Sequence, residues 1–210
     1  MEVRIDEGII KDAVDSITIK QTEEILKQMK QSICKVKGIM TGTGFFCYIN
    51  YKGQDTPCLM TNYHVLDKEF IKQNQKIEIS MNDNDINEEI IINEKDIIYS
   101  SSRNEYDIII IQLKRIEDYI YYLTLDDKLF NKNSEKAYDS IYILHYPNAL
   151  CASVSYGKGI KASNNKYDIE HKCNTLNGSS GGPILSLLTN EIIGIHKGTV
   201  QPNGKEKYNI

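Results

Sequence analysis

Short runs in which apolar and polar residues alternate begin at Ser32 and are separated by glycine, asparagine and aspartate. Alternation with a period of two is typical of strands that bury one face, and the separating residues are typical of turns. Such runs fill the first half of the chain and predict a first β-barrel over residues 32–113. They are SICKVKG, GTGFFCYINY, PCLMTNY, KIEIS, EEIIIN, KDIIYSS and YDIIIIQL.

A second series of runs predicts a second β-barrel over residues 138–210. Residues 114–137 mix charge and aromatics without regular alternation, so we expect a connector there. Residues 1–31 are an N-terminal lead-in with a short helix, Lys20 to Gln31, that has Ile25, Met29 and Ile33 on one side. The predicted fold class is all-β: two consecutive antiparallel β-barrels of the six-stranded type with a short N-terminal helix. The runs of the second barrel are SIYILHYP, CASVSYG, KYDIEHK, PILSLL, EIIGIHKG and EKYNI.

Composition narrows the class of partner. The 210 residues are 40% hydrophobic, which is ordinary for a folded domain, and carry a formal net charge of −4, which provides no basic field for a nucleic acid. No apolar run is long enough to span a membrane. The first residues lack the basic and apolar segments of a secretory signal, so we expect a cytoplasmic protein that contacts proteins or peptides. An odd number of irregularly spaced cysteines predicts reduced, buried thiols: Cys34, Cys47, Cys58, Cys151 and Cys173.

The segment GSSGGP, Gly178 to Pro183, carries the strongest chemical signal. Glycines on both sides of a serine allow a tight turn that exposes the hydroxyl and directs successive N–H groups into one small space. Acyl transfer requires this combination of a nucleophile, here Ser180, and donors for the developing oxyanion. A glycine-rich hairpin loop with two incidental serines is the alternative interpretation.

Two further residues lie at strand ends. His64 follows a predicted strand in TNYHVL, and Asp107 precedes four isoleucines in YDIIIIQL. A serine nucleophile needs a base with a near-neutral pKa, which histidine provides. A carboxylate beside a buried strand needs a partner, and orienting an imidazole would supply one. Taken singly, His64 would be a structural histidine and Asp107 a turn residue at the start of a strand.

The order His64, Asp107, Ser180 and the three motifs around them resemble the chymotrypsin-like, or trypsin-like, serine proteases. The intervals are similar to those of the compact bacterial and viral branches, and the resemblance covers roughly residues 32–198. It implies a double β-barrel and a serine endopeptidase that acts through an acyl-enzyme. It assigns Ser180 as nucleophile, His64 as general base and acid, and Asp107 as the residue that fixes the imidazole tautomer. The N–H groups of Gly178 and Ser180 would form the oxyanion hole.

Departures from the digestive enzymes are informative. Ser179 stands where those enzymes have an aspartate that pairs with a newly cut N-terminus, so activation by that ion pair is unavailable. No cysteine follows His64 directly, which agrees with a reducing compartment. Asn177 begins a glycosylation sequence, and a glycan there would obstruct the site. We therefore expect no maturation through a glycosylating route.

Thr175 and His196 occupy positions that resemble the S1 pocket of glutamyl endopeptidases and of the main proteases of small RNA viruses. An imidazole N–H and a hydroxyl would hydrogen-bond a Glu or Gln side chain and would penalise an apolar one. This predicts cleavage after Glu or Gln. The alternative for His196 is an ordinary strand histidine at the barrel surface.

The remaining histidines and cysteines suggest no cofactor and no metal site. His145 is interpreted as a half-buried strand residue before a turn limited by proline, and the spacing of His171 with Cys173 and Cys151 matches no standard zinc site. Two alternative functions stay open: an inactive protease-like module that binds peptides, and a protease module regulated by covalently attached domains of a larger sensor. The second follows from the expectation that the chain is truncated after its last strand.

Overall fold

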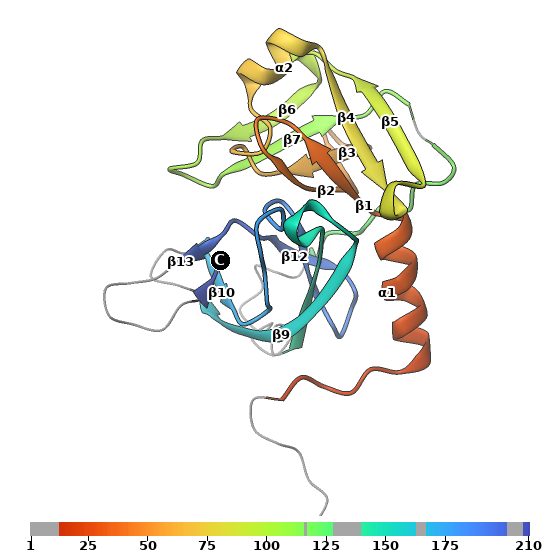
Figure 1. The fold of residues 1–210 in the computed structure, drawn as a ribbon, viewed down its shortest axis with the longest axis vertical. Coiled ribbons are helices and arrows are strands. Elements are labelled where there is room, and N and C mark those ends of the chain that lie inside the picture. The colour runs from red at the N-terminus through yellow and green to blue at the C-terminus, as the bar shows by residue number, and fades with distance from the viewer. Residues whose placement is uncertain (1–12, 116, 128–139, 163–166, 201–207) are drawn as a thin grey trace, which may run out of the picture.

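The computed structural model describes residues 13–115, 117–127, 140–162, 167–200 and 208–210. Two β-units follow one another along the chain and lie one above the other in Figure 1. The first part of the lead-in, residues 1–12, lies outside the described residues, as do residues 116 and 128–137 of the expected connector. Part of the last predicted strand, residues 206–207, also lies outside them.

The first sheet contains seven antiparallel strands in the described part of the chain, in the order β5-β4-β1-β2-β3-β7-β6. A two-residue turn at Lys52 and Gly53 joins β2 to β3, and both residues have positive φ (53° and 81°). Turns of this kind match the twist of the strands that they connect. The strands are β1 (Ile33–Lys37), β2 (Thr41–Tyr51), β3 (Gln54–Thr61), β4 (Lys76–Met81), β5 (Ile86–Ile91), β6 (Ile97–Ser101) and β7 (Ile108–Gln112).

The second sheet has the order β12-β11-β8-β9-β10-β14-β13 among the described residues. It has one strand beyond the six predicted runs, because Thr199 and Val200 pair with the last strand. The all-β class, with two consecutive antiparallel units and a short N-terminal helix, is confirmed. The strands are β8 (Ser140–His145), β9 (Ser153–Ala162), β10 (Ile169–His171), β11 (Pro183–Ser186), β12 (Ile192–Ile195), β13 (Thr199–Val200) and β14 (Tyr208–Asn209).

Helix α1 (Ile19–Gln31) begins one residue before the predicted start. The Thr18 hydroxyl accepts from the Gln21 N–H, and the Gln21 side chain accepts from the Thr18 N–H, which satisfies two amides that a helix start leaves unpaired. Ile25 is buried as predicted, but Ile33 belongs to β1, because the helix ends at Gln31 and Ser32 is its C-cap residue. Figure 1 shows α1 running beside the second unit toward the first.

A short second helix, α2 (Lys68–Asn74), was not predicted. The Asp67 side chain caps it by accepting from the Phe70 N–H at 2.7 Å, and Ile71 is its buried residue. Strand β3 ends at Thr61, two residues before the predicted end. His64 therefore lies in the short connection between β3 and α2.

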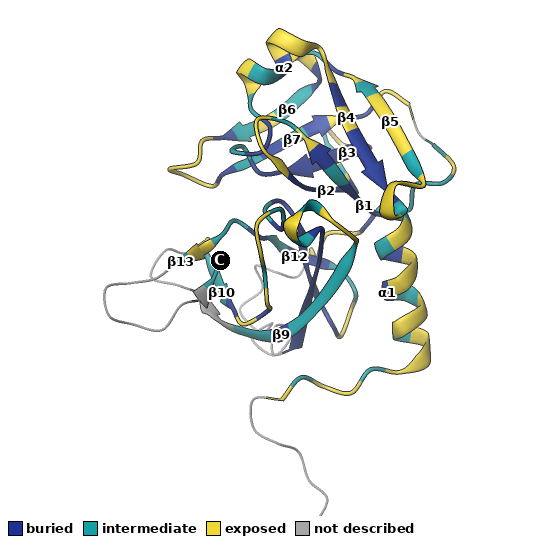
Figure 2. Cartoon of the chain, in the orientation of Figure 1, coloured by how far each residue is buried: buried dark blue, intermediate teal, exposed yellow. Residues whose placement is uncertain are grey.

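Three clusters of buried side chains form the core, and the buried strands are dark blue in Figure 2. One cluster lies within the first unit and a small one within the second. The third joins α1 and both units, with Ile25, Met60, Leu144 and Leu185 among its members. Each such side chain stabilises the fold by about 1.5–3 kcal/mol when fully buried. The two units are therefore joined by a common hydrophobic cluster as well as by the polypeptide chain.

The cysteines differ from one another in exposure. Cys151 is exposed, which corrects the expectation that every thiol is buried. The other four are at most 1% exposed and are free thiols, although Cys47 and Cys58 face each other on β2 and β3. Burial raises the pKa of Cys58 and of Cys173 to about 12, so these thiols stay protonated at neutral pH.

We expect iodoacetamide to label the native protein at Cys151 alone and to label all five thiols in urea, because the thiolate is the reactive form and burial suppresses it. Mass spectrometry of the labelled protein measures this. The Cys151→Ser variant serves as control and should take up no label before unfolding. Loss of two reactive thiols in urea without reductant would instead indicate a disulfide between Cys47 and Cys58.

Candidate active site

His64 and Asp107 form a hydrogen-bonded pair in the first unit. The His64 Nδ1 atom lies 2.6 Å from Asp107 Oδ2, and the His64 backbone N–H donates to Asp107 Oδ1 at 3.0 Å. An ionised carboxylate can only accept, so the proton of a neutral His64 ring lies on Nδ1 and Nε2 carries the lone pair. Both side chains are largely inaccessible to solvent: the His64 side chain is 10% exposed and the Asp107 side chain is 1% exposed. One carboxylate thus fixes both the position and the tautomer of the imidazole.

Asp107 itself has an unusual backbone. Its φ is 55°, a left-handed conformation that costs a non-glycine residue on the order of 1 kcal/mol or more. Several hydrogen bonds hold it: its N–H donates to the Ser102 carbonyl, and its carbonyl accepts from the Tyr63 N–H and from the Asn62 side chain at 2.8 Å. These contacts fix the residue directly before β7 against the segment that carries His64.

The loop that carries Ser180 lies against the first unit. The Thr43 N–H donates to the Ser180 carbonyl at 2.8 Å, and the Thr43 hydroxyl donates to the Gly178 carbonyl at 2.7 Å. Gly181 has φ 86°, and a Cβ there would lie 2.1 Å from the Thr43 carbonyl oxygen and 3.1 Å from the Asn62 nitrogen. Only glycine allows this close approach to the segment just before His64.

Two amides of this loop have no acceptor in the part of the chain that the structure describes. Gly178 has φ 88°, and a Cβ there would lie 2.6 Å from the Tyr146 carbonyl oxygen, so the glycine is again required. The Ser179 N–H donates to Leu176 and the Gly181 N–H donates to His196, but the N–H groups of Gly178 and Ser180 donate to no group of the described residues. Amides left unpaired beside a serine are the donors that an oxyanion requires.

The segment that carries His64 and the loop that carries Ser180 lie next to each other, but their reactive atoms are not hydrogen-bonded. Among the described residues, no hydrogen bond links His64 Nε2 to Ser180 Oγ. Bonds of this kind are often long in unliganded sites and shorten in the reacting complex. His64, Asp107 and Ser180 therefore lie in one region, with the His64–Asp107 contact formed.

Thr175, His196 and Ser180 line one cavity of about 370 Å³, together with Leu176 and Asn177. His196 is 2% exposed, so it is not the surface histidine of the alternative interpretation. Burial, with a smaller contribution from His171, lowers the pKa of His196 to about 3. The imidazole at this cavity is therefore neutral at neutral pH.

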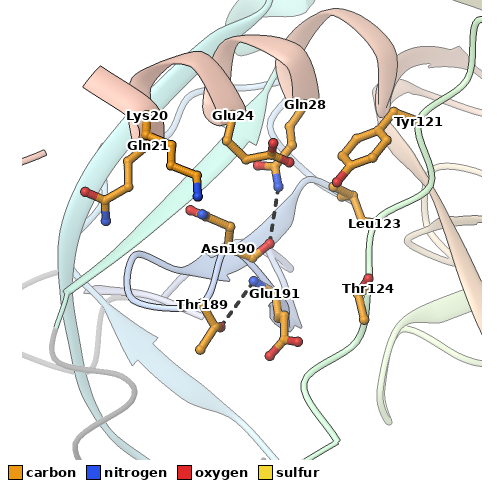
Figure 3. A pocket seen from close by; sticks show the side chains of 10 residues that line it. All are labelled: Lys20, Gln21, Glu24, Gln28, Tyr121, Leu123, Thr124, Thr189, Asn190 and Glu191. Carbon is orange, nitrogen blue, oxygen red and sulfur yellow. Dashed lines mark hydrogen bonds between the residues drawn. The ribbon is translucent and has the colours of Figure 1, made fainter. Parts of the chain in front are cut away.

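A larger cavity, of about 430 Å³, lies elsewhere, between α1 and the turn before β12. Figure 3 shows its polar lining, in which the Gln28 side chain donates to the Asn190 carbonyl at 3.2 Å. None of the predicted site residues lines this cavity. The larger cavity is thus separate from the predicted active site.

Comparison with protein families identifies the family of this chain. The model of the trypsin-like peptidase domain matches residues 42–195. The chain belongs to this family. No curated protein matches the sequence of this trypsin-like peptidase domain.

Solved structures support the same fold. The active form of the Rv3671c protease from M. tuberculosis is 15% identical with a TM-score of 0.60, over 100% of this chain and 88% of that one. Its inactive form is 15% identical with a TM-score of 0.59, over 94% and 92%. The serine endoprotease from Yersinia pestis is 14% identical with a TM-score of 0.64, over 92% of this chain and 62% of that one. The chymotrypsin-like double-barrel fold is confirmed.

The sequence reasoning missed several residues that position the site of this trypsin-like peptidase domain. Thr43 and Asn62 are fully buried and contact the serine loop and Asp107. His145 is 2% exposed, not half-buried as predicted, because its ring lies between Ser179 and Ser155. No local signal marks these side chains, since each contacts a segment far away in sequence.

No helix in the described ranges is long and apolar enough to cross a membrane.

We expect Thr43→Val to lower both stability and turnover. The substitution keeps the side-chain volume but removes the donor to Gly178 and the acceptor of the Tyr146 N–H, at a cost of about 1–3 kcal/mol in the free energy of unfolding. Urea denaturation and steady-state kinetics measure the two effects. Thr56→Val is the matched control, because the one hydrogen bond that the Thr56 hydroxyl makes to described residues lies within its own hairpin, to the Gln54 carbonyl. Equal behaviour of the two variants would contradict the assigned role of Thr43.

Proposed function

We propose that this trypsin-like peptidase domain is a serine endopeptidase that cleaves peptide bonds through an acyl-enzyme, with Ser180, His64 and Asp107 as its triad. The observation that carries the proposal is the buried His64–Asp107 pair, which leaves the lone pair on Nε2 while the adjoining loop presents Ser180 beside two unpaired amides. A positioned nucleophile, a base of known tautomer and oxyanion donors are the parts that acyl transfer requires.

The proposed chemistry follows from these positions. His64 Nε2 takes the proton of Ser180 Oγ as the oxygen attacks the scissile carbonyl carbon, and the carbonyl oxygen becomes an oxyanion. The N–H groups of Gly178 and Ser180 donate to that oxyanion. The C–N bond then breaks, and the imidazolium returns its proton to the leaving amine. Water, deprotonated by His64, attacks the Ser180 ester; the bond from the acyl carbon to Oγ breaks, and His64 returns the proton to Ser180 Oγ. Asp107 stays ionised and stabilises the imidazolium.

The proposed substrate class is a protein or peptide with Glu or Gln at the position before the cleaved bond, as in the glutamyl-endopeptidase branch that the sequence resembles. Thr175 and His196 line a cavity that also contains Ser180. A hydroxyl and a neutral imidazole offer hydrogen bonds to an amide or carboxylate, whereas a Lys or Arg side chain would bury its charge in a cavity whose described lining contains no Asp or Glu.

A fluorophosphonate probe tests the nucleophile. We expect it to label the native protein and to leave Ser180→Ala unlabelled, while Ser153→Ala, in which a serine outside the site is changed, labels normally. Asp107→Asn should reduce kcat by about 10⁴-fold, because the wrong tautomer then faces the serine. Labelling that persists in Ser180→Ala would exclude this serine. Tight peptide binding without labelling or turnover would favour the inactive binding module.

A peptide library that varies the residue before the cleaved bond tests specificity. We expect cleavage after Gln or Glu, and we expect Thr175→Val to lower kcat/KM for these substrates by about tenfold, the value of one lost hydrogen bond. Thr189→Val, which lines the other cavity, is the control and should leave the preference unchanged. Preferred cleavage after Lys, Arg or a large aromatic residue would contradict the pocket assignment and leave the triad assignment intact.

A further inference from the structure

Ser179, next to the proposed nucleophile, is fully buried and takes part in a chain of polar contacts behind the loop. Its hydroxyl accepts from the Leu176 N–H at 3.0 Å and lies 2.7 Å from His145 Nδ1. The other ring nitrogen of His145, Nε2, lies 3.1 Å from the Ser155 hydroxyl on β9. The His145 imidazole thus connects the loop to strand β9 of the second barrel.

The directions of these hydrogen bonds follow from the number of donors. Ser179 Oγ already accepts from Leu176, and its own proton needs an acceptor inside a fully buried space. His145 Nδ1 provides that acceptor if the ring carries its proton on Nε2, and Nε2–H then donates to Ser155. In this arrangement the Ser179 hydroxyl and both ring nitrogens of His145 have partners. The opposite tautomer would leave the Ser179 proton without an acceptor among the residues that the structure describes.

Ser179 also makes hydrogen bonds within its own loop. The Ser179 N–H donates to the Leu176 carbonyl, and the Leu176 N–H donates to the Ser179 hydroxyl, so the two residues are joined in both directions. Gly178 and Ser180, whose amides have no acceptor within the described ranges, flank Ser179 on either side. A shift of Ser179 would therefore turn both amides.

We propose that His145 is a positioning residue: through Ser179, its ring holds the loop in the conformation that points the Gly178 and Ser180 amides toward one oxyanion. This inference rests on the proposed function of the loop. His145 needs to be neutral for this role, and burial lowers its pKa to about 4, so it is neutral at neutral pH. Ser179 and His145 together thus replace a charged anchor with neutral hydrogen bonds.

Two measurements on the full chain test the proposal. The first is the ¹⁵N spectrum of the imidazoles at neutral pH, in which we expect His145 to show the Nε2–H tautomer. The signal is assigned by its loss in His145→Gln, and this readout does not depend on turnover. The Nδ1–H tautomer, or a doubly protonated ring, would overturn the proposed direction of the chain.

The second measurement is the kinetics of Ser179→Ala with a peptide substrate. We expect kcat to fall by about ten- to a hundredfold, less than the ~10²- to 10³-fold loss that follows removal of an oxyanion donor, with KM within about twofold of the native value. Affinity for a peptide aldehyde, which forms a tetrahedral adduct on Ser180, should fall in parallel, while affinity for a product peptide stays unchanged.

Ser186→Ala is the matched control, because Ser186 is also a fully buried serine of the second barrel whose hydroxyl accepts a backbone N–H, from Leu188. Equal kcat values for Ser179→Ala and Ser186→Ala in an active native enzyme would overturn the positioning role and leave the proposed function intact. A native protein with neither turnover nor probe labelling would overturn the proposed function, and with it the positioning role.

Discussion

The hydrogen bonds of Thr43 are the constraint on which the rest of the site depends. The residues proposed for catalysis are divided between two barrels, and Thr43 belongs to the first while its N–H and hydroxyl donate to Ser180 and Gly178 of the second. Its carbonyl accepts from Thr61 of β3, and its hydroxyl accepts from the Tyr146 N–H. Thr43 itself is fully buried, and an unpaired polar group in such a position costs about 1–3 kcal/mol. The two barrels therefore have one favourable alignment.

Burial also explains the detailed form of the His64–Asp107 pair. A carboxylate that is nearly inaccessible to water is costly unless hydrogen bonds compensate it, and Asp107 accepts from both the ring and the backbone N–H of His64. The same low polarity strengthens those bonds. The strained backbone of Asp107 persists because Ser102, Tyr63 and Asn62 hold both its N–H and its carbonyl. Strain, burial and orientation of the imidazole are thus consequences of one arrangement.

Much of this molecule could be predicted from the sequence, because the signals concerned are local. Alternation of apolar residues predicted the strands, and the glycines around Ser180 predicted the turn that the positive φ values of Gly178 and Gly181 require. The cost of burying a carboxylate indicated a partner for Asp107. Helix α2 was missed because a helix of 7 residues, about two turns, shows almost no periodicity, although Asp67 is a typical N-cap residue. Thr43 was missed because its role depends on Gly178, which lies 135 residues away.

The missing aspartate before Ser180 is the departure whose meaning only the structure could reveal. An aspartate at Ser179 would bring a charge into a fully buried space, and a charge there needs a cationic partner. A serine needs only a neutral acceptor and one donor, which His145 and Leu176 provide from residues already in the fold. In the proposed arrangement, neutral hydrogen bonds from His145 and Leu176 hold the loop in place of an ion pair.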